Sequence, residues 1–180
     1  MTLRAYFDQL DSAFFPKRGW AADVNVLKGL SGLGSDSDAT RWDANVIFAN
    51  TVGPHTIQAA FRGAGFLGRA REAGYGTLPW GGFLQQSGYS TGQLLNERFV
   101  FGRIAYVHKL AHFRLLEGVY AGISAEVGHY GAPVVPGNPE GTLFSGAAFL
   151  AIDSPIGPVY LGYGAGQDGN RSAYLFLGRP

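Results

Sequence analysis

The sequence predicts an all-β protein, specifically a closed antiparallel transmembrane β-barrel of about eight strands. Apolar residues alternate with polar or small ones along most of the chain, which is the period of a strand with two different faces. The composition, with 28 Gly, 13 Phe and 9 Tyr, suits many strands and aromatic belts. The segment 173–177 is apolar on both faces, so it is not expected to remain a free edge, and a closed barrel would pair it on both sides.

Alternation defines each expected strand. In 40–51, Trp42, Val46 and Phe48 share one face. Asp43 and Asn45 share the other face. Turns rich in Gly, Pro, Asp and Asn separate the alternating stretches. Nine candidate strands follow in order: 4–10, 20–30, 40–51, 55–66, 97–110, 113–127, 143–153, 159–164 and 173–177.

Length and composition limit the class of protein to which the chain can belong. The 180 residues suit one domain, 1–180, and the net charge of +1 predicts no nucleic-acid partner. The absence of cysteine rules out disulfides and thiolate metal sites. No apolar run is long enough for a membrane helix, and Asp8 and Asp11 interrupt the place of a signal peptide. Any export signal is therefore expected to lie upstream or to have been removed.

The alternation of apolar and polar residues does not determine which face of the sheet contacts water. A soluble, lipocalin-like binding barrel places apolar residues inside, whereas a membrane barrel places them against lipid. The connections favour the second interpretation, because short ones such as Gly53-Pro54 alternate with long ones such as 66–96 and 128–141. The residues expected to face lipid are Trp42, Val46, Phe48, Ile57, Phe61, Leu150 and Ile152. The expected lumenal polar network is Asp23, Asp43, Asn45, Gln58, Arg62, Arg103 and Glu126.

The sequence predicts no catalytic, cofactor or metal site. The string Gly122-Ile123-Ser124-Ala125-Glu126 lacks the last glycine of a G-x-S-x-G nucleophile motif and lies within a strand, so Ser124 is interpreted as a wall residue. His108 and His112 flank an expected turn, and two histidines without a third ligand are interpreted as rim residues. An outer-membrane barrel esterase remains an alternative function.

The order of four sequence blocks, FFPKRG, GGFLQQSGY, IDSPIGPVYLGYG and AYLFLGRP, resembles the C-terminal barrel of patatin-like outer-membrane proteins. These are patatin-type autotransporters within the bacterial surface antigen superfamily of assembly and secretion barrels. The resemblance runs from about Asp8 to Pro180 and covers the second half of that barrel only. It implies a bacterial outer-membrane anchor or translocator without its lipase domain. It also implies outer-membrane lipid or detergent and the outer-membrane assembly machinery as partners.

The resemblance also assigns loops. FFPKRG, Gly53-Pro54, Ala111-His112 and DSPIGP would be periplasmic turns. The superfamily's long loop, which folds back into the lumen, would contain Gly81, Gly82, Ser87, Gly88 and Tyr89. Most superfamily members have arginine where this chain has Ser87. Without a guanidinium to pair with an inner-wall carboxylate, the loop is not expected to be fixed to the wall in that way.

Closure requires an even number of antiparallel strands. We therefore expect 20–30 to pair with 173–177, which leaves residues 1–19 outside the closed ladder. The interior of such a barrel is only wide enough for its own side chains, so Arg62, Arg103, Asp43 and Glu126 are expected to meet there. The competing expectation is a homodimer, in which two chains join as half-barrels through the edges left by truncation.

Overall fold

The computed structural model describes residues 1–13, 15–30, 32, 39–67, 77–113, 116–154 and 157–178, excluding the side chains of residues 112, 113, 116, 117 and 132. Within these residues no helix is long and apolar enough to cross a membrane. The strands are β1 (Thr2–Asp8), β2 (Gly19–Lys28), β3 (Thr40–Val52), β4 (His55–Leu67), β5 (Leu78–Trp80), β6 (Leu94–Phe113), β7 (Leu116–Pro133), β8 (Gly141–Asp153), β9 (Val159–Gly166) and β10 (Arg171–Leu177).

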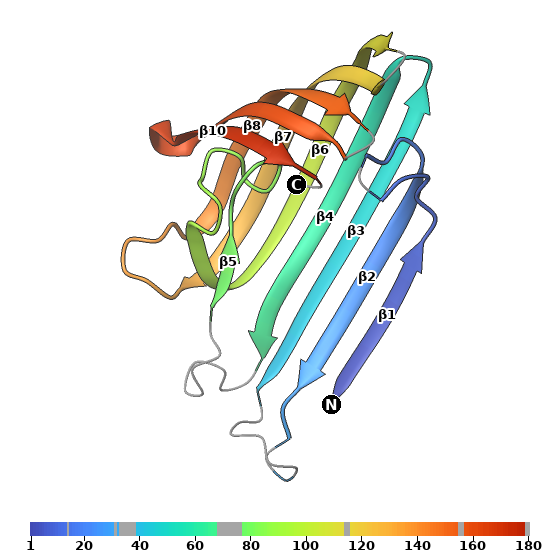
Figure 1. Ribbon diagram of the computed structural model, residues 1–180. Coiled ribbons are helices and arrows are strands. Elements are labelled where there is room, and N and C mark those ends of the chain that lie inside the picture. The colour runs from blue at the N-terminus through green and yellow to red at the C-terminus, as the bar shows by residue number, and fades with distance from the viewer. Residues whose placement is uncertain are drawn as a thin grey trace.

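All the strands belong to one antiparallel sheet, which confirms the all-β antiparallel prediction. The sheet order is β1-β2-β3-β4-β6-β7-β8-β9-β10, and β5 pairs only with β6. The sheet is strongly curved, and β7–β10 arch over the segment that follows β5 (Figure 1). Every expected strand is present, and β5 is an addition inside the expected long loop 66–96.

The predicted closure is wrong. β2 lies between β1 and β3, so it has no free edge for β10, and β1 belongs to the ladder from Thr2 to Asp8. Among the described residues, β1 and β10 each pair with one strand only. With β1 included, the path has an odd number of strands, and β1 and β10 run in the same direction. A seam between them would have to be parallel, so the antiparallel closure that was predicted for an even number of strands is not available to this ladder.

The predicted outward face is confirmed for most of its residues. Val46, Phe48, Ile57, Phe61, Leu150 and Ile152 are all exposed. Several of them lie opposite other apolar residues in the ladder; for example, Val46 lies opposite Phe61, and Leu150 lies opposite Leu161. Trp42 is half-buried because its ring lies against Gly63 and Gly65 of β4, where a Cβ would come within 3.0 Å of it. The convex face is therefore an apolar belt with no covering layer among the described residues.

Two turn assignments need correction. Ala111 and His112 lie within β6, which continues to Phe113, so both are strand residues and not turn residues. β7 extends to Pro133 and shortens the expected loop 128–141. The tight turn at Gly53-Pro54 is confirmed. Between β9 and β10 lies a short 3-10 helix, η2 (Gln167–Gly169). The residues outside the described part of the chain include 33–38 of the expected loop 32–38, 68–76 of the expected loop 66–96, 155–156 of the DSPIGP turn, and Pro180.

The core lies on the concave face of β6–β10. One aromatic cluster contains Phe15, Phe83, Tyr120, Phe149 and Tyr160. A second cluster contains Trp80, Tyr89, Phe99, Phe101 and Tyr130. The inner wall here is apolar and is covered by residues of the segment after β5, whereas only a mainly polar lumen was expected.

Candidate functional site

The segment from Gly81 to Gln93, here called the inner loop, follows β5 and lies inside the curve of the sheet (Figure 1). Its backbone is tightly wound. Gly81 and Gly82 have φ of 110° and 122°, which glycine tolerates without a Cβ clash. Leu84 and Gln86 adopt positive φ of 58° and 75° although both carry side chains. Such conformations persist where surrounding contacts hold them, so the inner loop is a fixed structure.

Ser87 attaches the inner loop to the wall through Glu126 of β7. The Ser87 backbone N–H donates to Glu126 Oε2 over 2.6 Å, and Ser87 Oγ donates to Glu126 Oε1 over 2.7 Å. Both residues are buried, at 0% and 3% exposure. The loop therefore contacts an inner-wall carboxylate even though it lacks the arginine that most superfamily members have at this position. The backbone N–H and the hydroxyl together present two donors to one carboxylate, as a guanidinium would.

Glu126 is fully used as an acceptor. Ser124 Oγ donates to Oε1 over 2.8 Å, and Ser145 Oγ of β8 donates to Oε2 over 2.9 Å. Each carboxylate oxygen thus accepts two hydrogen bonds. Arg103 of β6 lies directly opposite Glu126 in the ladder, and its Nη1 donates to the Leu84 carbonyl over 3.1 Å. A buried carboxylate requires such partners, so this group fixes the inner loop to three adjacent strands.

Two tyrosines hold the loop from other sides. Tyr174 Oη of β10 donates to the carbonyls of Ser87 and Tyr89, over 2.9 and 2.7 Å. Tyr130 Oη of β7 donates to Gln86 Oε1 over 2.9 Å. The inner loop therefore connects β6, β7 and β10, which span the curved half of the sheet.

β9 gives the loop a surface without side chains. Gly162, Gly164 and Gly166 alternate along β9 and face inward. A Cβ on Gly164 would overlap the Ser87 carbonyl, and a Cβ on Gly162 would lie 2.5 Å from the Phe83 ring. Gly88 in turn packs on the backbone of Gly166. The VYLGYG and GGFLQQSGY blocks of the sequence are therefore the two sides of one contact.

The predicted polar residues do not form one network. Asp23 accepts two hydrogen bonds from Arg4 of β1, at 2.9 and 2.7 Å, and Asp43 accepts one from Asn25. Arg62 lies over the Trp80 ring at 4.9 Å from its centroid. Asn45 lies between Asp23 and Arg62 in the ladder. Gln58 donates to the Pro16 carbonyl. The four residues expected to meet form two pairs: Arg103 and Glu126 are neighbours at the inner loop, and Asp43 and Arg62 interact electrostatically across β3 and β4.

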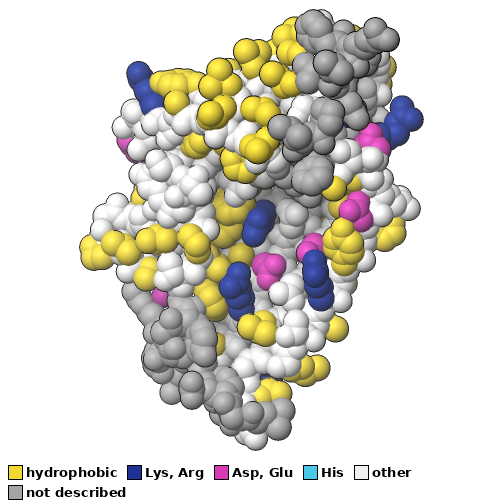
Figure 2. Space-filling model, in the orientation of Figure 1, with side chains coloured by type: hydrophobic (Ala, Val, Ile, Leu, Met, Phe, Trp, Pro, Cys, Tyr) yellow, Lys and Arg dark blue, Asp and Glu magenta, His cyan; other side chains and the backbone are white. Residues whose placement is uncertain are grey.

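Figure 2 shows charged side chains of both signs gathered in a hollow in front of β1–β4. The inward positions of these strands carry Arg4, Asp23, Asp43 and Arg62. The side chains of Arg4 and Asp23 are 59% and 31% exposed. The concave face thus has a filled, aromatic half under β6–β10 and an open, charged half under β1–β4.

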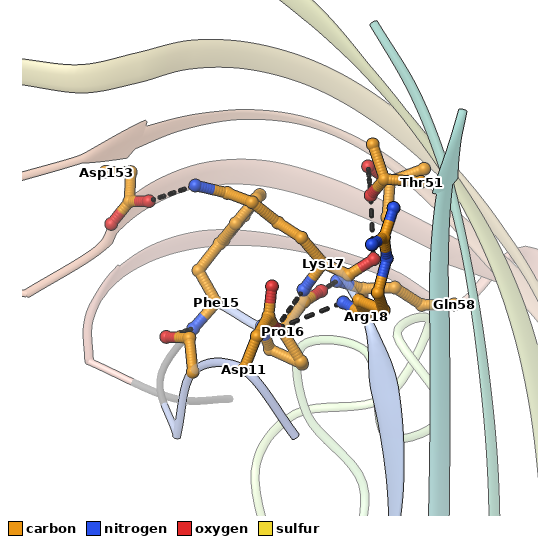
Figure 3. Close-up of polar contacts among 10 residues, drawn as sticks. Asp11, Phe15, Pro16, Lys17, Arg18, Thr51, Gln58 and Asp153 are labelled. Atoms are coloured by element: carbon orange, nitrogen blue, oxygen red, sulfur yellow. Dashed lines mark hydrogen bonds and ion pairs between the residues drawn. The ribbon is translucent and has the colours of Figure 1, made fainter. Parts of the chain in front are cut away.

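The described residues of the connection between β1 and β2, 9–13 and 15–18, also fold into the concave face (Figure 3). Phe15 is 1% exposed, and its ring centroid lies 4.6 Å from that of Tyr120 of β7. Lys17 Nζ reaches Asp153 at the end of β8 over 3.1 Å. Thr51 Oγ1 donates to the Lys17 carbonyl over 2.7 Å. This connection, expected as a simple periplasmic turn, therefore ties β3 and β4 to β7 and β8.

Lys17 makes this tie dependent on pH. Burial lowers the pKa of the ammonium group, but Tyr120 and Asp153 outweigh burial and hold that pKa above its ordinary value. A raised pKa means that the stabilisation is complete below about pH 10.5, the ordinary lysine value, and is lost as the pH rises through the folded-state pKa.

We expect Lys17→Met to lower the free energy of unfolding by about 1 kcal/mol or less at pH 8, because the pair is partly exposed. The difference from the parent chain should shrink above about pH 10.5. Urea unfolding in detergent at a series of pH values measures this difference in the free energy of unfolding. Lys28→Met, at an exposed position, is the control. A stability difference that does not change with pH would contradict a stabilising contribution from the Lys17–Asp153 ion pair.

Nothing in the described residues assembles a hydrolytic site around Ser124. Its Oγ donates to Glu126 and accepts from the Ala147 N–H over 3.1 Å, within the β7–β8 ladder. No group of three or more His, Asp or Glu side chains gathers anywhere in the described part of the chain. His108 lies beside His55 of the neighbouring strand. The side chain of His112 is outside the described residues.

The fold is similar to that of a solved structure, BamA from Haemophilus ducreyi lacking POTRA domains 1–3. The TM-score is 0.77 and the sequence identity is 13%, over 98% of this chain and 40% of that chain. The chain thus spans less than half the length of the protein it resembles, and the likeness concerns the fold. The sequence matches no protein-family model and no curated protein.

Proposed function

We propose that the chain is part of the wall of an outer-membrane β-barrel and serves as the membrane anchor or translocator part of a larger protein. The apolar belt on the convex face carries this proposal. Val46, Phe61, Ile104, Ile123, Leu150 and Leu161 are exposed at 37–62% on six consecutive strands of the sheet path, β3, β4, β6, β7, β8 and β9. A soluble monomer rarely exposes an apolar surface that is continuous over so many strands, whereas lipid requires one.

The likeness to a BamA structure supports a bacterial outer-membrane location for this chain. We further propose that its relatives are the patatin-like outer-membrane proteins, on the sequence blocks FFPKRG, GGFLQQSGY and VYLGYG. The contact between the last two blocks supports a common structural reason for their joint presence. Under this proposal lipid and the outer-membrane assembly machinery are the partners, and the chain itself is not an enzyme.

The two open edges imply further strands. Backbone N–H and C=O groups without partners are very costly inside a bilayer, so β1 and β10 need neighbours there. Two copies with the same membrane orientation would bring β10 against a β1 running in the same direction, which makes both seams parallel. We therefore propose that different strands, odd in number and running opposite to β1 and β10 at each seam, complete the barrel instead of a homodimer.

The test is fractionation. With an export signal added and the completing strands supplied, the chain should sediment with outer membranes and resist urea extraction. Its electrophoretic mobility in detergent should change on heating. A folded monomer in plain buffer would instead support the lipocalin-like carrier. Ester hydrolysis that Ser124→Ala abolishes would support the esterase.

The convex belt gives a direct prediction. Ala148 lies near the middle of β8, faces outward between Ile123 and Tyr163, and is exposed. Ala148→Arg should lower the free energy of unfolding in lipid by about 2–4 kcal/mol, because the guanidinium would face hydrocarbon. Ala148→Leu at the same position is the control and should be tolerated. Unfolding by urea in lipid vesicles measures both, and equal stabilities would contradict a lipid-facing β8.

A further inference from the structure

Two histidines meet on the convex face at the rim beside the Gly53-Pro54 turn. His55 is the first residue of β4, and it lies directly opposite His108 of β6 in the ladder. Their Nδ1 atoms are 3.3 Å apart, and the ring centroids are 4.9 Å apart. Because the antiparallel register fixes both backbones, the two imidazoles are held as a pair by the sheet itself.

The separation of the two nitrogens matches a shared metal ion. Two ligands of a tetrahedral ion, each about 2.0–2.1 Å from the metal, lie about 3.3–3.4 Å apart. The Nδ1 atoms already have this spacing, so an ion could sit between them with small changes in the ring torsions. Both side chains are at least partly exposed, which gives an ion and its water ligands access from the rim.

We propose that His55 and His108 form a binding site for a divalent transition-metal ion, with their Nδ1 atoms as ligands and water in the remaining positions. Imidazole is a preferred ligand for Cu²⁺, Ni²⁺ and Zn²⁺, and the general order of affinities puts Cu²⁺ first. No third His, Asp or Glu joins the pair in the described part of the chain, so the site is open. This site is independent of the proposed anchor function.

Tyr106 orients the pair and competes with the metal. Its Oη lies 2.7 Å from His55 Nδ1, and its ring stacks on the His55 ring at 5.9 Å. Metal binding requires the Nδ1 lone pairs of both histidines. The imidazole that carries a proton on Nδ1 must therefore move it to Nε2 through solvent, with no net change in charge. Tyr106 is a positioning residue here, and its hydroxyl is not needed as a ligand.

The experiment titrates CuCl2 into the folded protein in detergent. Electron paramagnetic resonance should report one Cu²⁺ coupled to two nitrogens. His108→Ala should weaken binding at least about tenfold, which corresponds to about 1.4 kcal/mol. Tyr106→Phe should keep the two-nitrogen signal. The matched control is His129→Ala, because His129 Nδ1 lies 3.1 Å from Thr142 Oγ1 and meets no second imidazole.

A second readout is thermal unfolding. Saturating Cu²⁺ should raise the unfolding temperature of the parent and of His129→Ala, because the ion ties β4 to β6, but not that of His108→Ala. Equal copper binding by His108→Ala and the parent would overturn the proposal and place the ion elsewhere, for example at the amino terminus. Loss of the signal in Tyr106→Phe would overturn the two-imidazole assignment. If His108→Ala does not fold, His55→Gln provides the same comparison.

Discussion

Glu126→Ala is expected to lower the free energy of unfolding by about 3–5 kcal/mol and to release the inner loop. The substitution removes the acceptor of four hydrogen bonds, two from Ser87 and one each from Ser124 and Ser145. Ser87 is buried and Ser124 and Ser145 are partly buried, so water does not replace the lost partner without cost. Arg103 at the opposite position of β6 would also lose the carboxylate that it faces.

A series of further variants distinguishes the loss of the Glu126 carboxylate from a general destabilisation of the sheet. Glu126→Gln keeps one acceptor oxygen and should cost less than alanine. Ser87→Ala keeps the backbone N–H contact and should cost about 1–2 kcal/mol. Glu140→Ala removes an exposed carboxylate next to β8 and should change stability by less than about 0.5 kcal/mol. Urea unfolding followed by gel mobility measures all four. If Glu126→Ala behaved like Glu140→Ala, the attachment of the inner loop to Glu126 would be refuted.

Gly164→Val is expected to expel the inner loop while leaving the strands in place. A Cβ at this position overlaps the Ser87 carbonyl, and valine itself is a good strand residue. Expulsion should also disrupt the contacts that bury Phe83 and Tyr89, which are 4% and 1% exposed. A cost of about 3 kcal/mol would raise the population of the open loop roughly a hundredfold.

Limited chymotrypsin digestion measures the expulsion of the inner loop in Gly164→Val, because the rate of cleavage at Phe83 or Tyr89 follows the population of the open loop. Gly102→Val is the matched control. A Cβ on Gly102 of β6 meets only Val127, at an ordinary 3.9 Å. The control should therefore be cut as slowly as the parent. Equal rates for both variants would contradict the packing of the loop on β9.

Alternation was sufficient to predict the two faces of the sheet, because pleating fixes the side of every second residue. It was not sufficient to predict the edges. All seven residues of β1 are exposed, so this strand has no buried face that its sequence could have signalled as part of the ladder. The closed barrel was inferred from the apolar character of 173–177, but this strand is apolar on both sides because Tyr174 and Phe176 pack inward on the aromatic cluster. The apolar character of 173–177 therefore did not require this strand to pair with a neighbour on both sides.

The inner loop was predicted by its sequence block but its attachment was not. Serine has no charge, so nothing in its side chain alone indicates a carboxylate partner; the second donor is a backbone N–H. A signal was nevertheless present in the alternating glycines of β9, since three successive inward positions without a side chain, Gly162, Gly164 and Gly166, indicate close approach of another backbone. His55 was missed as the partner of His108 because only the register across β4 and β6 brings them together.

The contents of the concave face have a consequence for the time course of folding. The sheet path grows by local antiparallel pairs, mostly hairpins, whose contacts are between neighbouring strands. The interior contacts instead join distant parts of the chain: Lys17 to Asp153 over 136 positions, and Tyr174 to Ser87 over 87. Because contacts of large sequence separation form slowly, the wall should assemble first and the interior should settle last. A wall with its inner loop still outside would be the natural late intermediate of this chain.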